Sequence, residues 1–183
     1  MKINIAAMKV LLFFTLLTGV VYPALLLAVS KLFFSDQARG SLVWSDGKPM
    51  ASMLLAQKPK SARYFQPRPS ATDYATVPAG ASQWGPTHPP LESAIAKRRA
   101  FWGKDAPADL LTTSGSGLDP HISPAAAQFQ VPLIAKARGW NGTQTAALEQ
   151  LVERSIEKPT FGFIGQARVN VLMLNRALET LSP

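Results

Sequence analysis

An uninterrupted apolar segment from Val10 to Phe34 constrains this chain more than any other feature of its sequence. Lys31 is the one charged residue within it. A helix of about 25 residues rises by about 37 Å, which exceeds the roughly 30 Å of hydrocarbon in a bilayer. Pro23 lies inside the segment, and membrane helices tolerate a proline where other helices pack nearby. The sequence therefore predicts a single transmembrane helix over residues 10–34.

A cleaved signal peptide is the alternative interpretation of the same segment. Lys2 and Lys9 form a basic region before it, and Ala28-Val29-Ser30 resembles a cleavage site. The apolar residues continue past that site, however, so we expect a retained anchor. Positive charges at the two ends of the segment are nearly balanced. We expect the simpler topology, with residues 1–9 as a short cytoplasmic tail and residues 35–183 outside the cytoplasm.

Composition narrows the choice of partners. The chain has 183 residues, a net charge of +8 and no cysteine, which excludes a disulfide framework. Its basic residues are dispersed, apart from a short cluster at Lys97-Arg98-Arg99 that we interpret as a solvated helix face. A nucleic-acid-binding domain would show a longer basic stripe interleaved with aromatic residues. We therefore expect the lipid bilayer as a partner and no nucleic acid.

The segment after the anchor combines strand and helix patterns. Asp46-Gly47 is a hairpin-turn signal between predicted strands at 41–44 and 50–55. A short apolar run at 161–165 is compatible with another strand. Helical spacing and caps predict helices at 91–102, at 125–130 and at 133–138, with a break at Pro132 between the last two. A further helix would run from Thr143 or Thr145 to residue 156. The last predicted helix covers 169–181, and its inward face would consist of Val169, Leu172, Met173 and Ala177. We therefore predict an α+β fold: one N-terminal transmembrane helix followed by one compact extracytoplasmic α+β domain.

A segment rich in proline, glycine, serine and alanine runs from residue 58 to residue 90. It also contains Tyr64, Phe65, Tyr74 and Trp84. Each aromatic side chain can bury a large apolar area and hold an irregular segment against a core. We therefore predict an ordered loop region here.

The segment from Ser114 to Pro124 carries the densest set of chemically capable side chains. Ser114 or Ser116, with His121 and Asp119, could supply a nucleophile, a base and a carboxylate, as in a membrane-anchored periplasmic hydrolase. A working triad needs the base between the other two groups, whereas Asp119 and His121 are separated only by a proline and should diverge. The strand–turn–helix nucleophile motif is also missing from the sequence. The hydrolase is therefore the weaker alternative.

Nucleotide and metal sites receive little support from the same residues. Ser114-Gly115-Ser116-Gly117 could form a nest of backbone amides for a phosphate, but no Walker lysine follows. An extracytoplasmic domain would also not meet ATP. The two histidines, His88 and His121, do not form a ligand-spaced pair, so we expect no metal and no directly bound cofactor.

A structural role explains these residues more simply. Asp119 and His121 would hydrogen-bond nearby backbone groups, while Ser123 caps a helix that begins at Pro124. Arg68 and Arg168 would each meet a carboxylate or a carbonyl within the domain. Asn170 or Asn175 would be buried and hydrogen-bonded.

Several short motifs, in order along the chain, resemble the C subunit of the Kdp potassium-transporting P-type ATPase, the KdpC family. The segment 114–124 belongs to this set. The others are Tyr64-Phe65-Gln66-Pro67-Arg68-Pro69-Ser70-Ala71, Gly85-Pro86-Thr87, Pro107-Ala108-Asp109-Leu110, Gln130-Val131-Pro132, Ala137-Arg138-Gly139 and Arg168-Val169-Asn170-Val171-Leu172.

The resemblance implies a non-catalytic accessory subunit of a high-affinity, ATP-driven potassium uptake complex in the cell inner membrane. It implies three partners: a channel-like potassium-translocating subunit, an ATP-hydrolysing P-type subunit and a small single-span subunit. The C subunit would support assembly and act as a catalytic chaperone that raises the ATP affinity of its partner, so ATP enters only by family association. Structural or interface candidates carried by the motifs are Arg68, Ser70, Asp119, His121, Ser123, Arg138, Arg168 and Asn170.

Overall fold

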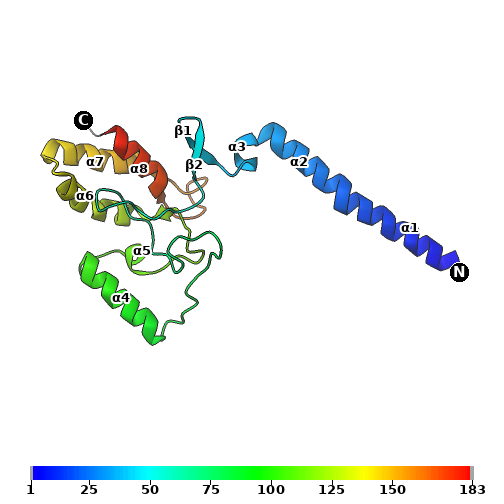
Figure 1. Ribbon diagram of the computed structural model, residues 1–183, viewed down its shortest axis with the longest axis horizontal. Helices are drawn as coiled ribbons and strands as arrows, with labels where there is room; N and C mark the ends of the chain where they lie inside the picture. Colours follow the sequence, from blue (N-terminus) through cyan, green and yellow to red (C-terminus); the bar gives the residue numbers. More distant parts are fainter. Residues whose placement is uncertain (1, 182–183) are drawn as a thin grey trace. The chain divides into compact units, whose positions relative to one another are not determined.

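A computed structural model describes residues 2–181 of the chain (Figure 1). The chain divides into two compact units, Met1–Ser52 and Met53–Pro183. We call them the N-terminal unit and the C-terminal unit.

A long helical segment dominates the N-terminal unit. It consists of α1 (Lys2–Leu16), a π-helical turn η1 (Leu17–Val21) and α2 (Tyr22–Phe33). The part from Asn4 to Phe33 has the length and hydropathy needed to cross a membrane. The predicted apolar helix is confirmed, and its helical conformation extends back through residues 2–9.

The π-helical turn lies just before Pro23, which has no backbone N–H to continue the helical ladder. The turn is wide enough for the Tyr22 amide to donate to the Leu17 carbonyl. The Thr18 hydroxyl donates to the Phe14 carbonyl at 2.7 Å. The proline therefore perturbs the helix locally and does not end it.

A short helix and a β-hairpin complete the N-terminal unit. Helix α3 (Ser35–Ala38) precedes strands β1 (Leu42–Ser45) and β2 (Lys48–Ser52), which pair antiparallel. Asp46 and Gly47 have φ values of 51° and 72°, as a two-residue type I′ turn requires. The predicted hairpin is confirmed, although β2 ends at Ser52 rather than at Leu55.

The C-terminal unit mixes helices with a small sheet, as the predicted fold class requires (Figure 1). Strand β5 is central in a three-stranded antiparallel sheet of order β3-β5-β4. Helix α7 contacts both α6 and α8. The elements are α4 (Pro89–Trp102), α5 (Ala108–Leu111), β3 (His121–Ile122), α6 (Pro124–Arg138), α7 (Gly142–Arg154), β4 (Ile156–Glu157), β5 (Arg168–Asn170) and α8 (Val171–Thr180).

One core joins these helices and strands. Ile122 of β3 and Val169 of β5 are buried against residues of α6, α7 and α8. The fully buried helix residues include Ile134, Leu148, Leu174 and Leu178. The central strand is therefore fixed to the helical layer, and this sets the position of the loops that leave it.

The predictions for α6 and α7 each contain an error. Pro132 does not interrupt α6, because it lies on the exposed face, where the carbonyl it leaves without a partner can meet water. Helix α7 is capped by Asn141, not by a threonine: the Asn141 side chain accepts from the Gln144 amide, and the Gln144 side chain accepts from the Asn141 amide.

The final predicted helix begins too early. Val169 belongs to β5, where it pairs with Ile122 and Ile156, and α8 starts at Val171. The helix buries Val171, Leu174 and Leu178 rather than the predicted inward face. The predicted strand at 161–165 is also wrong, because these residues form a tight turn closed by a bridge between Thr160 and Ile164.

The segment from residue 53 to residue 88 contains no helix or strand, and all of it lies within the described structure. Phe65 is fully buried, and the Tyr74 hydroxyl donates to the Arg68 carbonyl at 3.0 Å. Trp84 behaves differently, since it remains 40% exposed and stacks on His88. The predicted ordered loop is thus fixed by several aromatic residues but not by Trp84.

Candidate functional site

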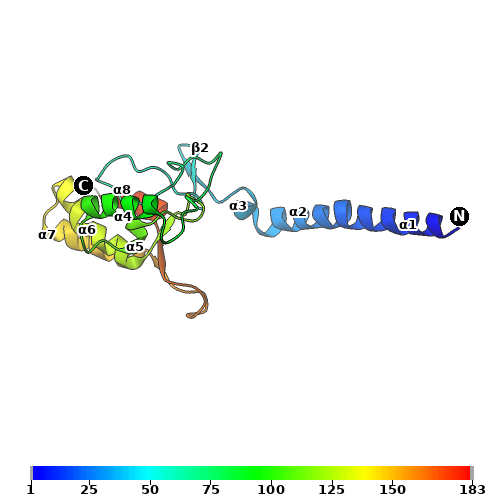
Figure 2. The same ribbon diagram turned by 90° about the horizontal axis from the view of Figure 1, so that it is seen from below.

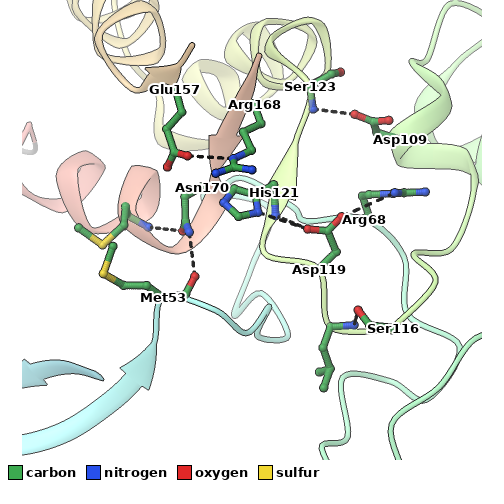
Figure 3. A network of polar contacts seen from close by, with 12 residues as sticks. Met53, Arg68, Asp109, Ser116, Asp119, His121, Ser123, Glu157, Arg168 and Asn170 are labelled. Carbon is green, nitrogen blue, oxygen red and sulfur yellow. Dashed lines mark hydrogen bonds and ion pairs between the residues drawn. The ribbon is translucent and has the colours of Figure 1, made fainter. Parts of the chain in front are cut away.

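The pairing of β3 with β5 brings together two segments that the sequence separates (Figure 3). His121 is directly opposite Asn170, and Ile122 is opposite Val169. The Val171 amide adds a hydrogen bond of 2.9 Å to the Pro120 carbonyl. The segment 114–124 and the motif at 168–172 therefore form one continuous structure.

Asp119 is the centre of the polar contacts in this region (Figure 3). Its Oδ1 accepts from the His121 amide at 3.0 Å and lies 3.4 Å from His121 Nδ1. Its Oδ2 lies 3.7 Å from Arg68 Nη1. The expectation that Asp119 and His121 diverge is wrong, because the bond to the His121 amide folds the carboxylate back over Pro120.

Arg68 links this carboxylate to the irregular segment 53–88. Its Nη2 donates to the Thr113 carbonyl at 3.3 Å, so the arginine meets both a carbonyl and a carboxylate. Tyr74 in turn donates to the carbonyl of Arg68. The side chains of Arg68, Asp119 and His121 all remain partly accessible, so the Arg68–Asp119 ion pair contributes little to stability.

The glycine-containing turn is packed tightly against the same irregular segment. The Ser114 amide donates to the Pro69 carbonyl and the Gly117 amide to the Ser114 carbonyl, each at 3.2 Å. Gly117 has a φ of 71°, and a Cβ there would lie 2.6 Å from the Gly80 carbonyl oxygen and 3.2 Å from Ser70 Oγ. The turn therefore needs glycine at this position, and two of its amides are already used by protein carbonyls.

Neither serine of the turn is arranged as a nucleophile. Ser114 is only 2% exposed, and its hydroxyl has no hydrogen-bond partner among the described residues. Ser116 Oγ accepts from the Leu118 amide at 3.1 Å. Within residues 2–181 no hydrogen bond joins either serine to His121. The structure thus gives the hydrolase alternative no support.

Ser70 and Ser123 each satisfy backbone amides. Ser70 Oγ accepts from the amides of Thr72 at 3.2 Å and Tyr74 at 2.9 Å. Ser123 Oγ accepts from the Ala126 amide at 3.1 Å, which confirms the predicted cap of α6. The Ser123 amide donates to Asp109 Oδ2 at 2.6 Å. Asp109 lies in the motif Pro107-Ala108-Asp109-Leu110, but nothing in its sequence context indicates this contact.

Asn170 and Arg168 order the other side of the strand pair (Figure 3). Asn170 Oδ1 accepts from the Met173 amide at 3.2 Å and caps α8, while its Nδ2 donates to the Met53 carbonyl at 2.9 Å. Arg168 Nε donates to Glu157 Oε2 at 2.9 Å, across the β4–β5 pair. These contacts join the start of the C-terminal unit to its central strand and close the base of the β4–β5 loop.

Arg138 does not join this group. Its side chain is buried in a separate cluster, where Nε donates to the Arg63 carbonyl at 2.9 Å. Its guanidinium lies 5.3 Å from the centre of the Tyr64 ring and 5.0 Å from that of Trp140. This arrangement fixes the end of α6 to the segment 63–64 through cation–π contacts.

Tyr74, which donates to the Arg68 carbonyl, has a clearly perturbed ionisation. Burial raises the pKa of its phenol, and the neighbouring Asp73 carboxylate raises that pKa further, while Arg98 opposes both effects. Residues 2–181 contain no group of three His, Cys, Asp or Glu side chains that could hold a metal ion. The hydrogen bonds of Ser116, Asp119 and Ser123 to backbone amides hold the segment 114–124 in one conformation.

Comparison with known proteins identifies a family that covers nearly the whole chain. The model of KdpC, described as the K+-transporting ATPase c chain, matches residues 4–180. A potassium-transporting ATPase KdpC subunit from Methylococcus capsulatus is 48% identical, with 96% of each chain covered. Proteins of the same name are 43% identical in Cereibacter sphaeroides, over 94% of each chain, and 44% identical in Polaromonas naphthalenivorans, over 98% of this chain and 96% of that one.

Proposed function

The chain belongs to the KdpC family, the c chain of the K+-transporting ATPase, and we propose that it serves that complex as a non-enzymatic accessory subunit. The observation that carries this proposal is that polar side chains of segment 114–124 form hydrogen bonds with the protein's own backbone. The side chains of Ser116, Asp119 and Ser123 each accept a hydrogen bond from a backbone amide of the same unit, so these groups fix the shape of the segment. A rigid unit in a chain that also carries a candidate membrane helix suits a subunit that acts through protein contacts.

The proposed task is assembly and stabilisation of the complex, with an indirect effect on ATP turnover. The partners would be the channel-like potassium-translocating subunit, the ATP-hydrolysing P-type subunit and the small single-span subunit. A catalytic-chaperone effect, meaning a higher ATP affinity of the hydrolysing subunit, would pass through these contacts. No direct ATP contact is proposed, because the amides of Ser114 and Gly117 already donate to protein carbonyls.

The proposed location is the cell inner membrane, with one span and the bulk of the chain in the periplasm. The helix from Asn4 to Phe33 supports the span, and Lys9 and Lys31 lie near its ends. The uncharged stretch between these lysines is about 21 residues or about 31 Å long, which matches the hydrocarbon thickness. The C-terminal unit would then meet its partners on the outer side of the membrane.

The proposed function is tested by expressing the other subunits with and without this chain. Potassium-stimulated ATPase activity and co-purification of the subunits are measured in detergent. Without the chain, we expect the complex to fall apart or to lose most of its potassium-stimulated activity, and re-expression of the intact chain should restore both. An intact and fully active complex that lacks the chain would overturn the proposal.

The proposed topology has its own test, because the natural chain has no cysteine. A single cysteine at the exposed Gln166 should react with a membrane-impermeant maleimide in cells whose outer membrane alone is permeabilised. A single cysteine at Lys2 should react only after the inner membrane is opened. The reverse labelling pattern would show the opposite orientation.

A further inference from the structure

The loop between β4 and β5 ends in an apolar tip that no described residue of the chain covers. We call residues Phe161, Gly162, Phe163 and Ile164 the FGFI tip. Phe161 is 84% exposed, Phe163 79% and Ile164 53%. Figure 2 shows the loop between yellow α7 and red α8 projecting away from the helices of the C-terminal unit. Adjacent aromatic and aliphatic side chains at this exposure are typical of an interaction surface.

The tip has a fixed backbone shape. The Thr160 and Ile164 amides each donate to the other residue's carbonyl at 2.9 Å, and the Gly162 amide donates to the Pro159 carbonyl at 2.9 Å. Phe161 has a φ of 55°, in the left-handed region that a bulky residue rarely adopts. The turn holds this phenylalanine in water, where it adds nothing to the core, and backbone strain of this kind occurs mostly at functional sites.

The base of the loop is equally well fixed. Arg168 and Glu157 pair across β4 and β5, and the next residue, Val169, is fully buried. Strand β5 also pairs with β3, which joins it to the polar contacts of Asp119 and His121. The candidate functional site therefore holds the strand from which the FGFI tip projects.

We propose that the FGFI tip is an anchor that inserts into an apolar pocket on another subunit of the K+-transporting ATPase. This inference rests on the proposed function, in which the C-terminal unit acts through protein contacts. Binding energy at interfaces concentrates in a few aromatic and aliphatic anchors that fill pockets. Because the tip is already rigid, little conformational entropy is lost when it inserts.

A protein pocket fits the tip better than a lipid surface does. Lys158 is the one ionisable residue from 158 to 167, and the Arg168 charge at the base is paired with Glu157. Attraction to anionic lipid headgroups needs a cluster of unpaired basic residues, and insertion among acyl chains does not require a particular turn geometry. The loop thus has the shape of a specific contact and little of the charge of a membrane-binding one.

The tip supplies only part of the interface. Its three large side chains expose on the order of 400 Å², whereas a stable protein interface buries about 800 Å² on each partner. Other surfaces of the subunit must contribute the remainder. Loss of the tip should therefore weaken retention of the subunit and need not abolish assembly.

The test uses the whole complex with the double variant Phe161→Ser and Phe163→Ser. We expect at least about a tenfold faster loss of this subunit from the detergent-solubilised complex, because changes at anchors act mainly on dissociation. Phe101→Ser is the matched control, since Phe101 is also an exposed phenylalanine, at 78%, but lies on α4. Unchanged thermal unfolding of the purified double variant would show that the fold is retained.

Retention of the double variant equal to that of the natural chain and of the control would overturn the inference. A photo-crosslinking amino acid at position 163 gives an independent measurement. It should form an adduct with one protein subunit in the assembled complex, whereas adducts with lipid alone would favour the membrane and overturn the proposal. If deletion of the whole chain disrupts the complex but neither tip experiment shows an effect, only the tip inference fails and the proposed function stands.

Discussion

Asn175 and Phe65 are joined by two hydrogen bonds, 110 residues apart in the chain. The Phe65 amide donates to Asn175 Oδ1 at 2.8 Å, and Asn175 Nδ2 donates to the Phe65 carbonyl at 3.0 Å. Gln130 makes the same pair of bonds with the next residue, Gln66, at 2.7 and 3.1 Å. Two amide side chains from α8 and α6 thereby take the place of a neighbouring strand, and this satisfies the backbone of an otherwise irregular segment.

Replacing Asn175 should therefore be costly. Asn175→Ala leaves the amide and carbonyl of Phe65 without partners beside a fully buried ring, which we expect to lower the free energy of unfolding by about 2–4 kcal/mol. Urea unfolding of the full chain in detergent measures this change. Gln166→Ala, at an exposed amide, is the control and should change stability by less than about 0.5 kcal/mol. Equal stabilities of the two variants would contradict this interpretation of the amide pairs.

Replacing Gly117 by alanine should destabilise the fold, whereas the same replacement at the nearby Gly115 should not. Gly117→Ala places a methyl group 2.6 Å from the Gly80 carbonyl at a positive φ, so backbone must move. We expect a loss of about 2–4 kcal/mol in unfolding free energy. Gly115→Ala meets nothing within 4 Å and should be nearly neutral. Thermal unfolding of both variants in the same detergent checks the prediction, and a neutral Gly117→Ala would show that the turn is not tightly packed.

The parts of the fold that follow from local chemistry could be predicted. Asp46-Gly47 specifies its turn through backbone conformation, and Ser123-Pro124 specifies a helix start, so both signals need only a few neighbouring residues. The apolar helix is similarly encoded by its own composition. These features do not depend on what the rest of the chain does.

The remaining features depend on tertiary contacts that the local pattern does not carry. Pro132 is tolerated inside α6 on its exposed face, and which face of a helix is exposed depends on the whole fold. Val169 continues the apolar periodicity of α8, but pairing with Ile122 draws it into a strand. The contacts of Asn175 and Gln130 span long separations, so an amide in a helix gives no indication of its partner. The apolar run from Phe161 to Ile164 has the composition of a buried strand, and the sequence alone does not show that these residues are exposed.

Two variants of Asp119 measure separately how much its charge and its hydrogen bond contribute to the free energy of unfolding. Asp119→Asn keeps the oxygen that accepts from the His121 amide and removes the charge 3.7 Å from Arg68. Because both side chains are partly exposed, we expect a loss below about 1 kcal/mol. Asp119→Ala removes the acceptor as well, and we expect a further loss of about 1 kcal/mol. Parallel urea titrations check the order, and a larger effect of the asparagine variant would contradict it.

Tyr74 links stability to alkaline pH with a definite sign. The folded unit holds the pKa of Tyr74 above its ordinary value of 10.0, mainly through burial and then through Asp73. A group whose pKa is higher in the folded state contributes stability that is complete below the unfolded pKa and is lost as the pH rises through the folded pKa. The natural chain should therefore lose this contribution above about pH 10.

Tyr74→Phe isolates the contribution because it keeps the ring and removes the hydroxyl. At neutral pH the variant should be less stable by about 1 kcal/mol, since the hydrogen bond to the Arg68 carbonyl is lost. Above pH 10 the difference in unfolding free energy between the two chains should shrink. The unfolded natural chain then releases the Tyr74 proton more readily than the folded chain does, and this lowers the stability of the natural chain alone. Unfolding free energies of both chains between pH 7 and 11 measure the difference, and subtraction removes other titrating groups such as Tyr64. A difference that stays constant over this range would show that burial of Tyr74 does not perturb its ionisation.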